Sequence, residues 1–242
     1  MRQGLRGAMH QKLEGAVRQG LNGAVHQGLN SAVRGGFCRG IRLVAILAGF
    51  WLSLGAAAAL ADLPSTEAAL ADRVLGDANA PVTMFDFSSM TCPHCADFHT
   101  KTLPELKTRY IDTGKLKLVF RDFPLDRSAL HAAMLARCAP AARYYGFLDV
   151  LFKSQATWGR APDPKKALAQ IGALGGVPAA DFETCLATKA LEDGLIQRTY
   201  EAQKQFNIKS TPTFIFNNGA ERIEGGQSLE KFQEVIDRLL KP

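Results

Sequence analysis

The stretch "SSMTCPHCADF", residues 88–98, places Cys92 and Cys95 three positions apart, where a strand is expected to end and a helix to begin. The preceding segment, 81–89, is short and rich in β-branched and aromatic residues, which predicts a buried strand. The following segment carries apolar residues at helical spacing and stops at Gly114, which predicts a helix. A cysteine pair at such a junction can bind a metal, close a structural disulfide or exchange electrons.

The rest of the chain predicts an α/β fold that is interrupted by helices. A second strand, 115–125, follows the first helix, in which Pro104 predicts a kink. From residue 128 to about 207 the pattern is helical, with breaks at Pro and Gly: 128–138, 143–156, 165–174 and 179–206. The chain then predicts a strand at 211–219, its hairpin partner at 220–226 and an amphipathic helix at 228–241. This order indicates a small α/β core with an inserted helical subdomain.

The position of the cysteine pair favours redox chemistry. Cys92 would lie at a helix N-terminus, where unpaired backbone N–H groups and the helix dipole stabilise a thiolate. Pro93 fits the first helical position, because it needs no N–H there. His94 adds a group near the sulfur that can donate a hydrogen bond or carry positive charge. A lowered thiol pKa stabilises the reduced form and makes the disulfide a stronger oxidant, and Cys95, one turn deeper, would be the buried partner.

The other two interpretations of the pair are weaker. Cys92, Cys95 and His99 could share one helix face as zinc ligands, but a fourth ligand would have to come from elsewhere, and the chain has no second Cys-x-x-Cys. A structural disulfide across two intervening residues would close almost no loop and would add little stability. We therefore expect a redox pair, with no metal and no bound cofactor.

The segment "KSTPTF", 209–214, is the second candidate element of the site. Thr211 and Pro212 stand just before a predicted strand, where a proline cannot donate to the sheet. An ordinary trans proline at a strand start is one interpretation. The other is a cis-proline beside the cysteine pair, which leaves a backbone edge open to an extended substrate. The presence of the Cys-Pro-His-Cys motif favours the second.

From residue 75 to 242 the chain resembles the DsbA-like thiol:disulfide oxidoreductases of the thioredoxin superfamily. The resemblance covers the strand into "CPHC", a helical insertion at about 128–207, "TPTF", the hairpin and the last helix. It implies a thioredoxin-like fold with an inserted helical subdomain. It also implies that Cys92 is the nucleophile, that Cys95 is the resolving cysteine, and that Thr211 and Pro212 form a substrate-binding cis-proline pair.

Two further residues gain a candidate role from this resemblance. Asp86 lies six residues before Cys92, where relatives often carry an acid beneath the active site. A buried carboxylate there would relay protons or modulate the thiolate, whereas a solvated acid at a strand end would do neither. His99 stands four residues after Cys95, where some members carry another acid. A neutral histidine would alter the local field, so the family's redox potential does not transfer to this chain.

Cys138 and Cys185 lie 47 residues apart in the helical segment. In an oxidising compartment we expect them to form a structural disulfide, for which chain entropy gives a stabilisation of roughly 4 kcal/mol at most. The alternative is two separately buried thiols.

The N-terminal quarter of the chain predicts export. Residues 41–61 are apolar, follow Arg39 and end in Ala59-Leu60-Ala61, the layout of a secretory signal peptide cleaved after Ala61. This predicts a periplasmic protein, and the alternative is an uncleaved anchor in the inner membrane. Within the leader, 1–40, residues 2–33 are four tandem octapeptides. They are either a functional array or a duplicated tract translated from a start site placed too far upstream.

The charge distribution argues against nucleic-acid binding. Residues 1–61 contain seven of the 29 Lys and Arg residues and one of the 23 acids, a net charge of +6. The remaining chain has 22 of each and is neutral, so the basic character belongs to the leader.

The sequence therefore predicts an exported thiol:disulfide oxidoreductase that donates its Cys92–Cys95 disulfide to reduced exported proteins. The resemblance implies re-oxidation by a quinone-linked membrane partner of the DsbB type. One alternative is an isomerase or reductase kept reduced by a membrane donor, since a threonine before the proline occurs there too. Such isomerases carry a separate dimerisation domain, for which 62–79 is too short, so we expect a monomer. A second alternative is a non-catalytic thioredoxin-like chaperone module.

Overall fold

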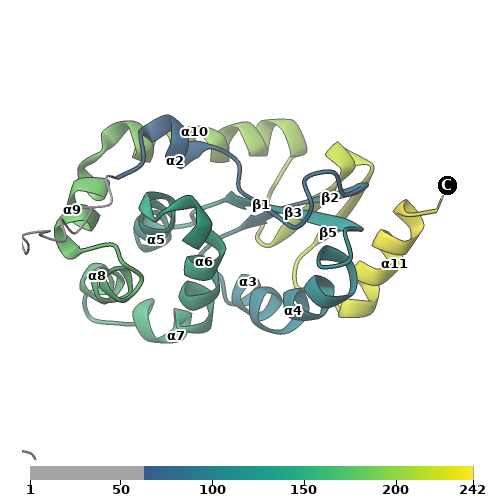
Figure 1. The fold of residues 1–242 in the computed structure, drawn as a ribbon, viewed down its shortest axis with the longest axis horizontal. Coiled ribbons are helices and arrows are strands. Elements are labelled where there is room, and N and C mark those ends of the chain that lie inside the picture. The colour runs from purple at the N-terminus through teal and green to yellow at the C-terminus, as the bar shows by residue number, and fades with distance from the viewer. Residues whose placement is uncertain (1–62, 242) are drawn as a thin grey trace, which may run out of the picture. The chain divides into compact units, whose positions relative to one another are not determined.

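A computed structural model describes residues 63–241 (Figure 1). The predictions of an octapeptide leader at 1–40 and of a signal peptide or anchor at 41–61 fall outside this part of the chain. Between residues 63 and 241, no helix is both long enough and apolar enough to cross a membrane.

The core is a mixed sheet of five strands in the order β1-β3-β2-β4-β5. Strands β2 and β3 are parallel, and the other three neighbouring pairs are antiparallel. The bounds are β1 Val74–Leu75, β2 Val82–Ser88, β3 Leu116–Asp122, β4 Thr213–Phe216 and β5 Glu221–Glu224. The predicted strand 211–219 is shorter than expected, because Asn217–Gly219 turns into a 3-10 segment, η4, in which Asn217 and Asn218 have positive φ. Strand β2 is central, so the residues that follow it emerge from the middle of the sheet.

Helices cover both faces of this sheet (Figure 1). Strand β2 leads into a continuous helical run made of α3 Pro93–Asp97, η1 Phe98–Thr102, α4 Leu103–Leu106 and η2 Lys107–Ile111. The kink predicted at Pro104 takes the form of a π-helical turn, in which the Leu103 N–H donates to the Phe98 carbonyl five residues earlier. Phe98 packs against Phe214 of the sheet and Phe232 of the last helix, α11 Leu229–Leu239.

Seven helical elements lie between β3 and β4 and form the inserted subdomain. Its elements are α5 Arg127–Cys138, η3 Ala141–Arg143, α6 Tyr144–Lys153, α7 Gln155–Trp158, α8 Pro164–Leu174, α9 Ala179–Ala187 and α10 Lys189–Phe206. Two predicted helices are each divided: 143–156 breaks at Ser154 and 179–206 breaks at Thr188. Neither break contains Pro or Gly, which explains why the sequence did not reveal it. Helix α10 covers the sheet face opposite α3 and α4 (Figure 1).

The domain begins earlier than the expected boundary at residue 75. A short helix, α2 Thr66–Leu70, is capped by Ser65, whose side chain accepts a hydrogen bond from the Ala68 N–H. Its Ala69 is buried in a small cluster with residues of α5 and α10. The following strand, β1, pairs with β3. Both elements are too short to show a hydrophobic period, and they were not predicted.

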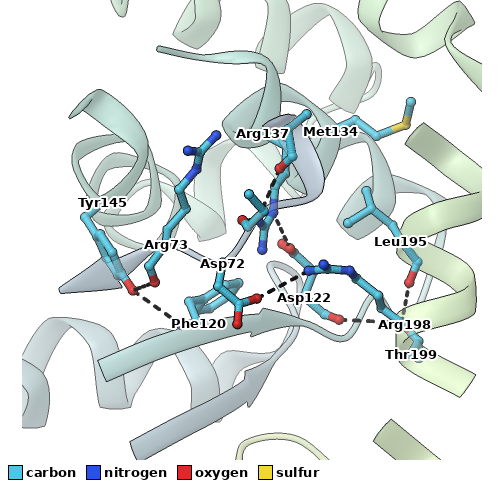
Figure 2. A network of polar contacts seen from close by, with 12 residues as sticks. Asp72, Arg73, Phe120, Asp122, Met134, Arg137, Tyr145, Leu195, Arg198 and Thr199 are labelled. Carbon is cyan, nitrogen blue, oxygen red and sulfur yellow. Dashed lines mark hydrogen bonds and ion pairs between the residues drawn. The ribbon is translucent and has the colours of Figure 1, made fainter. Parts of the chain in front are cut away.

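A disulfide and a buried ion pair connect the insertion internally and to the sheet. The sulfur atoms of Cys138 and Cys185 are bonded and join α5 to α9. Next to it, the Arg137 Nε donates to the Asp122 carboxylate over 2.8 Å, and both side chains are almost completely buried (Figure 2). The Arg137 guanidinium also donates to the carbonyls of Ala69 and Ala71. This one side chain therefore joins β3, α5 and the end of α2.

Replacing Arg137 with methionine should destabilise the domain strongly. The change removes the cation and leaves the Asp122 carboxylate buried without its partner, which typically costs about 3–5 kcal/mol. Urea denaturation of the purified domain measures this loss. The matched control is Lys153→Met, which breaks the exposed pair with Asp149 and should cost under about 1 kcal/mol. Equal and small losses in the two variants would contradict the structural role of Arg137.

Candidate active site

The end of β2 and the start of α3 position the cysteine pair. Cys92 occupies the N-cap of α3 in an extended conformation, with φ −78° and ψ 120°, and Pro93 is the first helical residue. Both cysteines are free thiols in the structure. Cys92 is 7% exposed and Cys95 is fully buried, while Pro93 and His94 face solvent. Cys92 is therefore the cysteine that a second molecule can reach.

Hydrogen bonds lower the pKa of the Cys92 thiol from 9.0 to about 5. The largest cause is the hydrogen bond with the Cys95 side chain, followed among the favourable causes by Thr211 and by the backbone N–H groups of Cys95 and His94. Burial acts in the opposite direction. The His94 ring lies near Gly226, and the backbone N–H of His94 is among the groups that lower the Cys92 pKa. Cys92 is thus a thiolate at neutral pH.

The Cys95 thiol behaves in the opposite way. Burial raises its pKa well above 9.0, and the hydrogen bond with Cys92 raises it further. The same hydrogen bond therefore favours the charge on Cys92 and disfavours it on Cys95. The pair divides into one anion that retains slight exposure and one fully buried neutral thiol.

The loop before β4 brings Thr211 and Pro212 against the nucleophile. The Thr211–Pro212 peptide bond is cis. The Cys92 Sγ lies 3.4 Å from the Thr211 carbonyl oxygen, across 119 residues of sequence. Pro212 is buried, and its carbonyl accepts the Gly225 N–H of the neighbouring hairpin. The two motifs that the sequence singled out therefore form one site.

Asp86 and His99 form a buried pair beneath the cysteines. The His99 Nε2 and the Asp86 Oδ2 are 2.7 Å apart, and Asp86 is fully buried in the central strand. Asp86 is therefore not a solvated acid at a strand end. The His99 ring stacks on Phe152 of α6, with ring centroids 4.0 Å apart. His99 thus connects the sheet to the insertion, a position that its spacing alone did not reveal.

Ser88 completes the chain of contacts from Asp86 to Cys95, and the sequence reasoning did not identify it. Its hydroxyl donates to the Asp86 Oδ1 and also forms a hydrogen bond with the Cys95 thiol. Since side chains alternate along a strand, residues 86 and 88 lie on the same face of β2. That period of two is the signal that could have revealed Ser88.

The zinc interpretation has no support from this geometry. Among residues 63–241, no group of three or more His, Cys, Asp or Glu side chains is arranged to hold a metal ion. The Nε2 of His99 is directed at Asp86 instead. The arrangement fits thiol–disulfide exchange, which needs one accessible thiolate and one protected partner.

Comparisons with known proteins agree with this site. A thioredoxin family model matches residues 68–238. A putative protein-disulfide oxidoreductase of Rickettsia felis is 34% identical over 171 residues, which are 70% of this chain and 60% of that protein. The chain spans less than two thirds of the length of this and two similar Rickettsia proteins.

Solved structures extend the comparison. The crystal structure of alpha-DsbA1 from Wolbachia pipientis superposes with a TM-score of 0.64 at 33% identity, over 69% of this chain and 90% of that one. BdbD from Bacillus subtilis has the same TM-score at 22% identity, over 74% and 97% of the two chains, and shares the fold. The family match over most of the chain and the alpha-DsbA1 likeness together show that this chain belongs to the thioredoxin family, among its DsbA-like members.

Proposed function

We propose that this chain is a thiol:disulfide oxidoreductase that donates the Cys92–Cys95 disulfide to reduced protein substrates. The observation that carries the proposal is the division of the pair into a stabilised thiolate at Cys92 and a buried neutral thiol at Cys95. Stabilising the thiolate favours the reduced enzyme, and an enzyme that favours its reduced form is a good oxidant. The names of the relatives, protein-disulfide oxidoreductases, support the same reaction class.

The reaction transfers two electrons in two exchange steps. A substrate thiolate attacks the Cys92 Sγ, the Cys92–Cys95 bond breaks, and Cys95 leaves and takes up a proton. A second thiolate of the substrate then attacks the substrate sulfur of this mixed disulfide, and Cys92 leaves as a thiolate. The substrate gains a disulfide, and the enzyme retains both electrons. The low pKa of Cys92 makes it the better leaving group in the second step.

Thr211 and Pro212 are the proposed binding point for the substrate backbone. The Thr211 carbonyl lies beside the reacting sulfur. Pro212 has no N–H to offer to the sheet, so the loop leaves backbone groups available to an extended peptide. A peptide placed here would present its own cysteine to Cys92.

Asp86, Ser88 and His99 are proposed to handle the proton of Cys95. The Ser88 hydroxyl contacts both the Asp86 carboxylate and the Cys95 thiol, so it connects the acid to the leaving sulfur. The hydrogen bond with His99 offsets the free-energy cost of burying the Asp86 carboxylate in the core. In this role Asp86 and His99 modulate the pair without touching the substrate.

The cellular setting is also part of the proposal. The apolar segment 41–61 favours export to the periplasm with cleavage after Ala61, and the anchored form is the alternative. The substrates would be reduced exported proteins, and a quinone-linked membrane partner of the DsbB type would remove the electrons. The enzyme would act as a monomer without a bound cofactor or metal, and Cys138–Cys185 would be a structural disulfide.

A second candidate function is disulfide isomerisation or reduction by an enzyme that a membrane donor keeps reduced. Thr211 is the residue that permits this alternative. A threonine before the proline is compatible with both an oxidase and an isomerase, so it does not distinguish the two activities. A non-catalytic chaperone module is the third alternative. It would not depend on the Cys92 sulfur.

Replacing Cys95 with alanine should trap the reaction at its first intermediate. The variant keeps the Cys92 nucleophile but lacks the thiol that releases it, so it should accumulate a mixed disulfide with an oxidised or glutathionylated test protein. Non-reducing electrophoresis and mass spectrometry detect this species. Cys92→Ser should form none. Full activity in Cys92→Ser would instead identify a non-catalytic module and refute the proposed function.

Cys92 should ionise near pH 5, as measured by the thiolate absorbance at about 240 nm in the reduced protein. Because the folded pKa lies below the unfolded value, the reduced form gains stability relative to the oxidised form as the pH rises from about 5 toward 9.0. That gain is lost as the pH falls through 5. Equilibration with glutathione should then give a potential of about −120 mV. A potential of about −270 mV would favour the isomerase or reductase alternative.

Replacing Asp86 with asparagine should slow the release of Cys95. Without the carboxylate the proton relay through Ser88 is lost, and general acid–base catalysis of this kind is worth about a hundredfold. Stopped-flow measurement of mixed-disulfide formation reports this step. The control is Asp97→Asn, which changes an exposed acid of α3, the helix that carries Cys95; Asp97 is paired with Lys101. A faster reaction in Asp86→Asn would show that the acid acts only through its charge.

A further inference from the structure

The break between α6 and α7 places two consecutive turns of the insertion against the active site. The sequence predicted one helix at 143–156, but the chain bends at Ser154, where φ is −99° and ψ is 8°. The single turn of α7 is fixed by Trp158, whose ring is buried and whose Nε1 donates to the Leu151 carbonyl over 2.8 Å. Phe152 precedes the bend and stacks on His99. The residue that follows the bend, Gln155, contacts the nucleophile's own backbone.

The Gln155 amide donates to two carbonyls of the active-site loop. Its Nε2 lies 2.9 Å from the Met90 oxygen and 2.9 Å from the Cys92 oxygen. A primary amide has two N–H donors, so both are used. The Cys92 carbonyl also accepts the Ala96 N–H, the first hydrogen bond of α3. Gln155 therefore connects the insertion to the residue at which α3 begins.

We infer that Gln155 is a positioning residue for the exchange reaction and that its two N–H groups keep Cys92 in the thiolate-stabilising geometry. The inference rests on the proposed function and adds to it a role for the insertion. Thiolate stabilisation depends on backbone N–H groups of His94 and Cys95 that reach the Cys92 sulfur. Those N–H groups remain directed at the sulfur only while the backbone of residues 90–92 is fixed. Gln155 fixes it at both ends.

The electrostatics act in the same direction. The Met90 and Cys92 carbonyl oxygens carry partial negative charge close to a sulfur that must become an anion. N–H donors on these oxygens offset that charge; without Gln155 the Met90 carbonyl would lose its donor, and the Cys92 carbonyl would keep only the Ala96 N–H. A purely structural role would stabilise the reduced and oxidised proteins equally. A positioning role would change the pKa of the Cys92 thiol, so a measurement of this pKa distinguishes a positioning role from a purely structural one.

The test compares a variant that keeps the shape of Gln155 with one that keeps its donors. Gln155→Met has a similar length and no N–H, and it should raise the Cys92 pKa by about one unit. The equilibrium constant for oxidation by this enzyme against glutathione should fall about tenfold, or about 30 mV for two electrons. Gln155→Lys retains a donor to the same carbonyls and should leave the Cys92 pKa at or below that of the wild type.

The controls address folding and distance. Gln197→Met removes an exposed glutamine of α10 that is bonded to Glu201, and it should change neither the pKa nor the equilibrium constant. Urea denaturation of the oxidised proteins verifies that each variant is folded. If Gln155→Met does not fold, Gln155→Ala removes the same donors with a good helix-forming residue. Failure of both to fold would overturn the inference in favour of a role in folding alone.

The outcomes also separate this inference from the proposed function. A wild-type protein that does not exchange disulfides with glutathione would refute the proposed function itself. An active wild type with an unchanged Cys92 pKa in Gln155→Met would refute only the role of Gln155. An equal rise of the pKa in the Met and Lys variants would show that shape, not hydrogen bonding, is what matters, and would also overturn the inference.

Discussion

The hydrogen bond between Cys92 and Cys95 is the interaction on which the site depends. It lowers the pKa of one thiol and raises the pKa of the other, so a single contact makes the two sulfurs chemically different. The surrounding structure maintains this difference. The backbone N–H groups at the start of α3 and the Thr211 side chain stabilise the charge on Cys92, and burial disfavours a charge on Cys95. This difference favours transfer of the disulfide to the substrate, because Cys92, the sulfur that leaves in the second step, is the more stable thiolate.

Each of the supporting groups comes from a different part of the chain. The cysteines follow the central strand β2, Thr211 comes from the loop before β4, and Phe152 and Gln155 come from the insertion. The insertion is therefore more than a cover for the α/β core. Its α6–α7 bend contacts the site at two points, on the ring of His99 and on the backbone of Cys92.

Local patterns identified the parts of the site that depend on neighbours in sequence. The Cys-Pro-His-Cys motif at a strand–helix junction predicted the N-cap cysteine, and the fold class followed from the order of the elements. Several contacts between distant residues were not predicted, although the sequence did place Thr211 and Pro212 beside the cysteines and Cys138 beside Cys185. Nothing near His99 indicates that its ring pairs with Asp86 and stacks on Phe152, and the bend at Ser154 has no Pro or Gly signal. The elements α2 and β1 are too short to show a hydrophobic periodicity in the sequence. Even so, Arg137 donates to a carbonyl at the end of α2.

The guanidinium of Arg137 has a consequence for how the molecule loses its structure. From helix α5 it forms hydrogen bonds with the end of β3 and with the end of α2, and it is buried where these elements meet (Figure 2). Separating the helical insertion from the sheet would expose this cation and the Asp122 carboxylate together. An intermediate with only one of the two regions folded is therefore costly. The α/β core and the insertion should melt in one cooperative transition rather than in two independent ones.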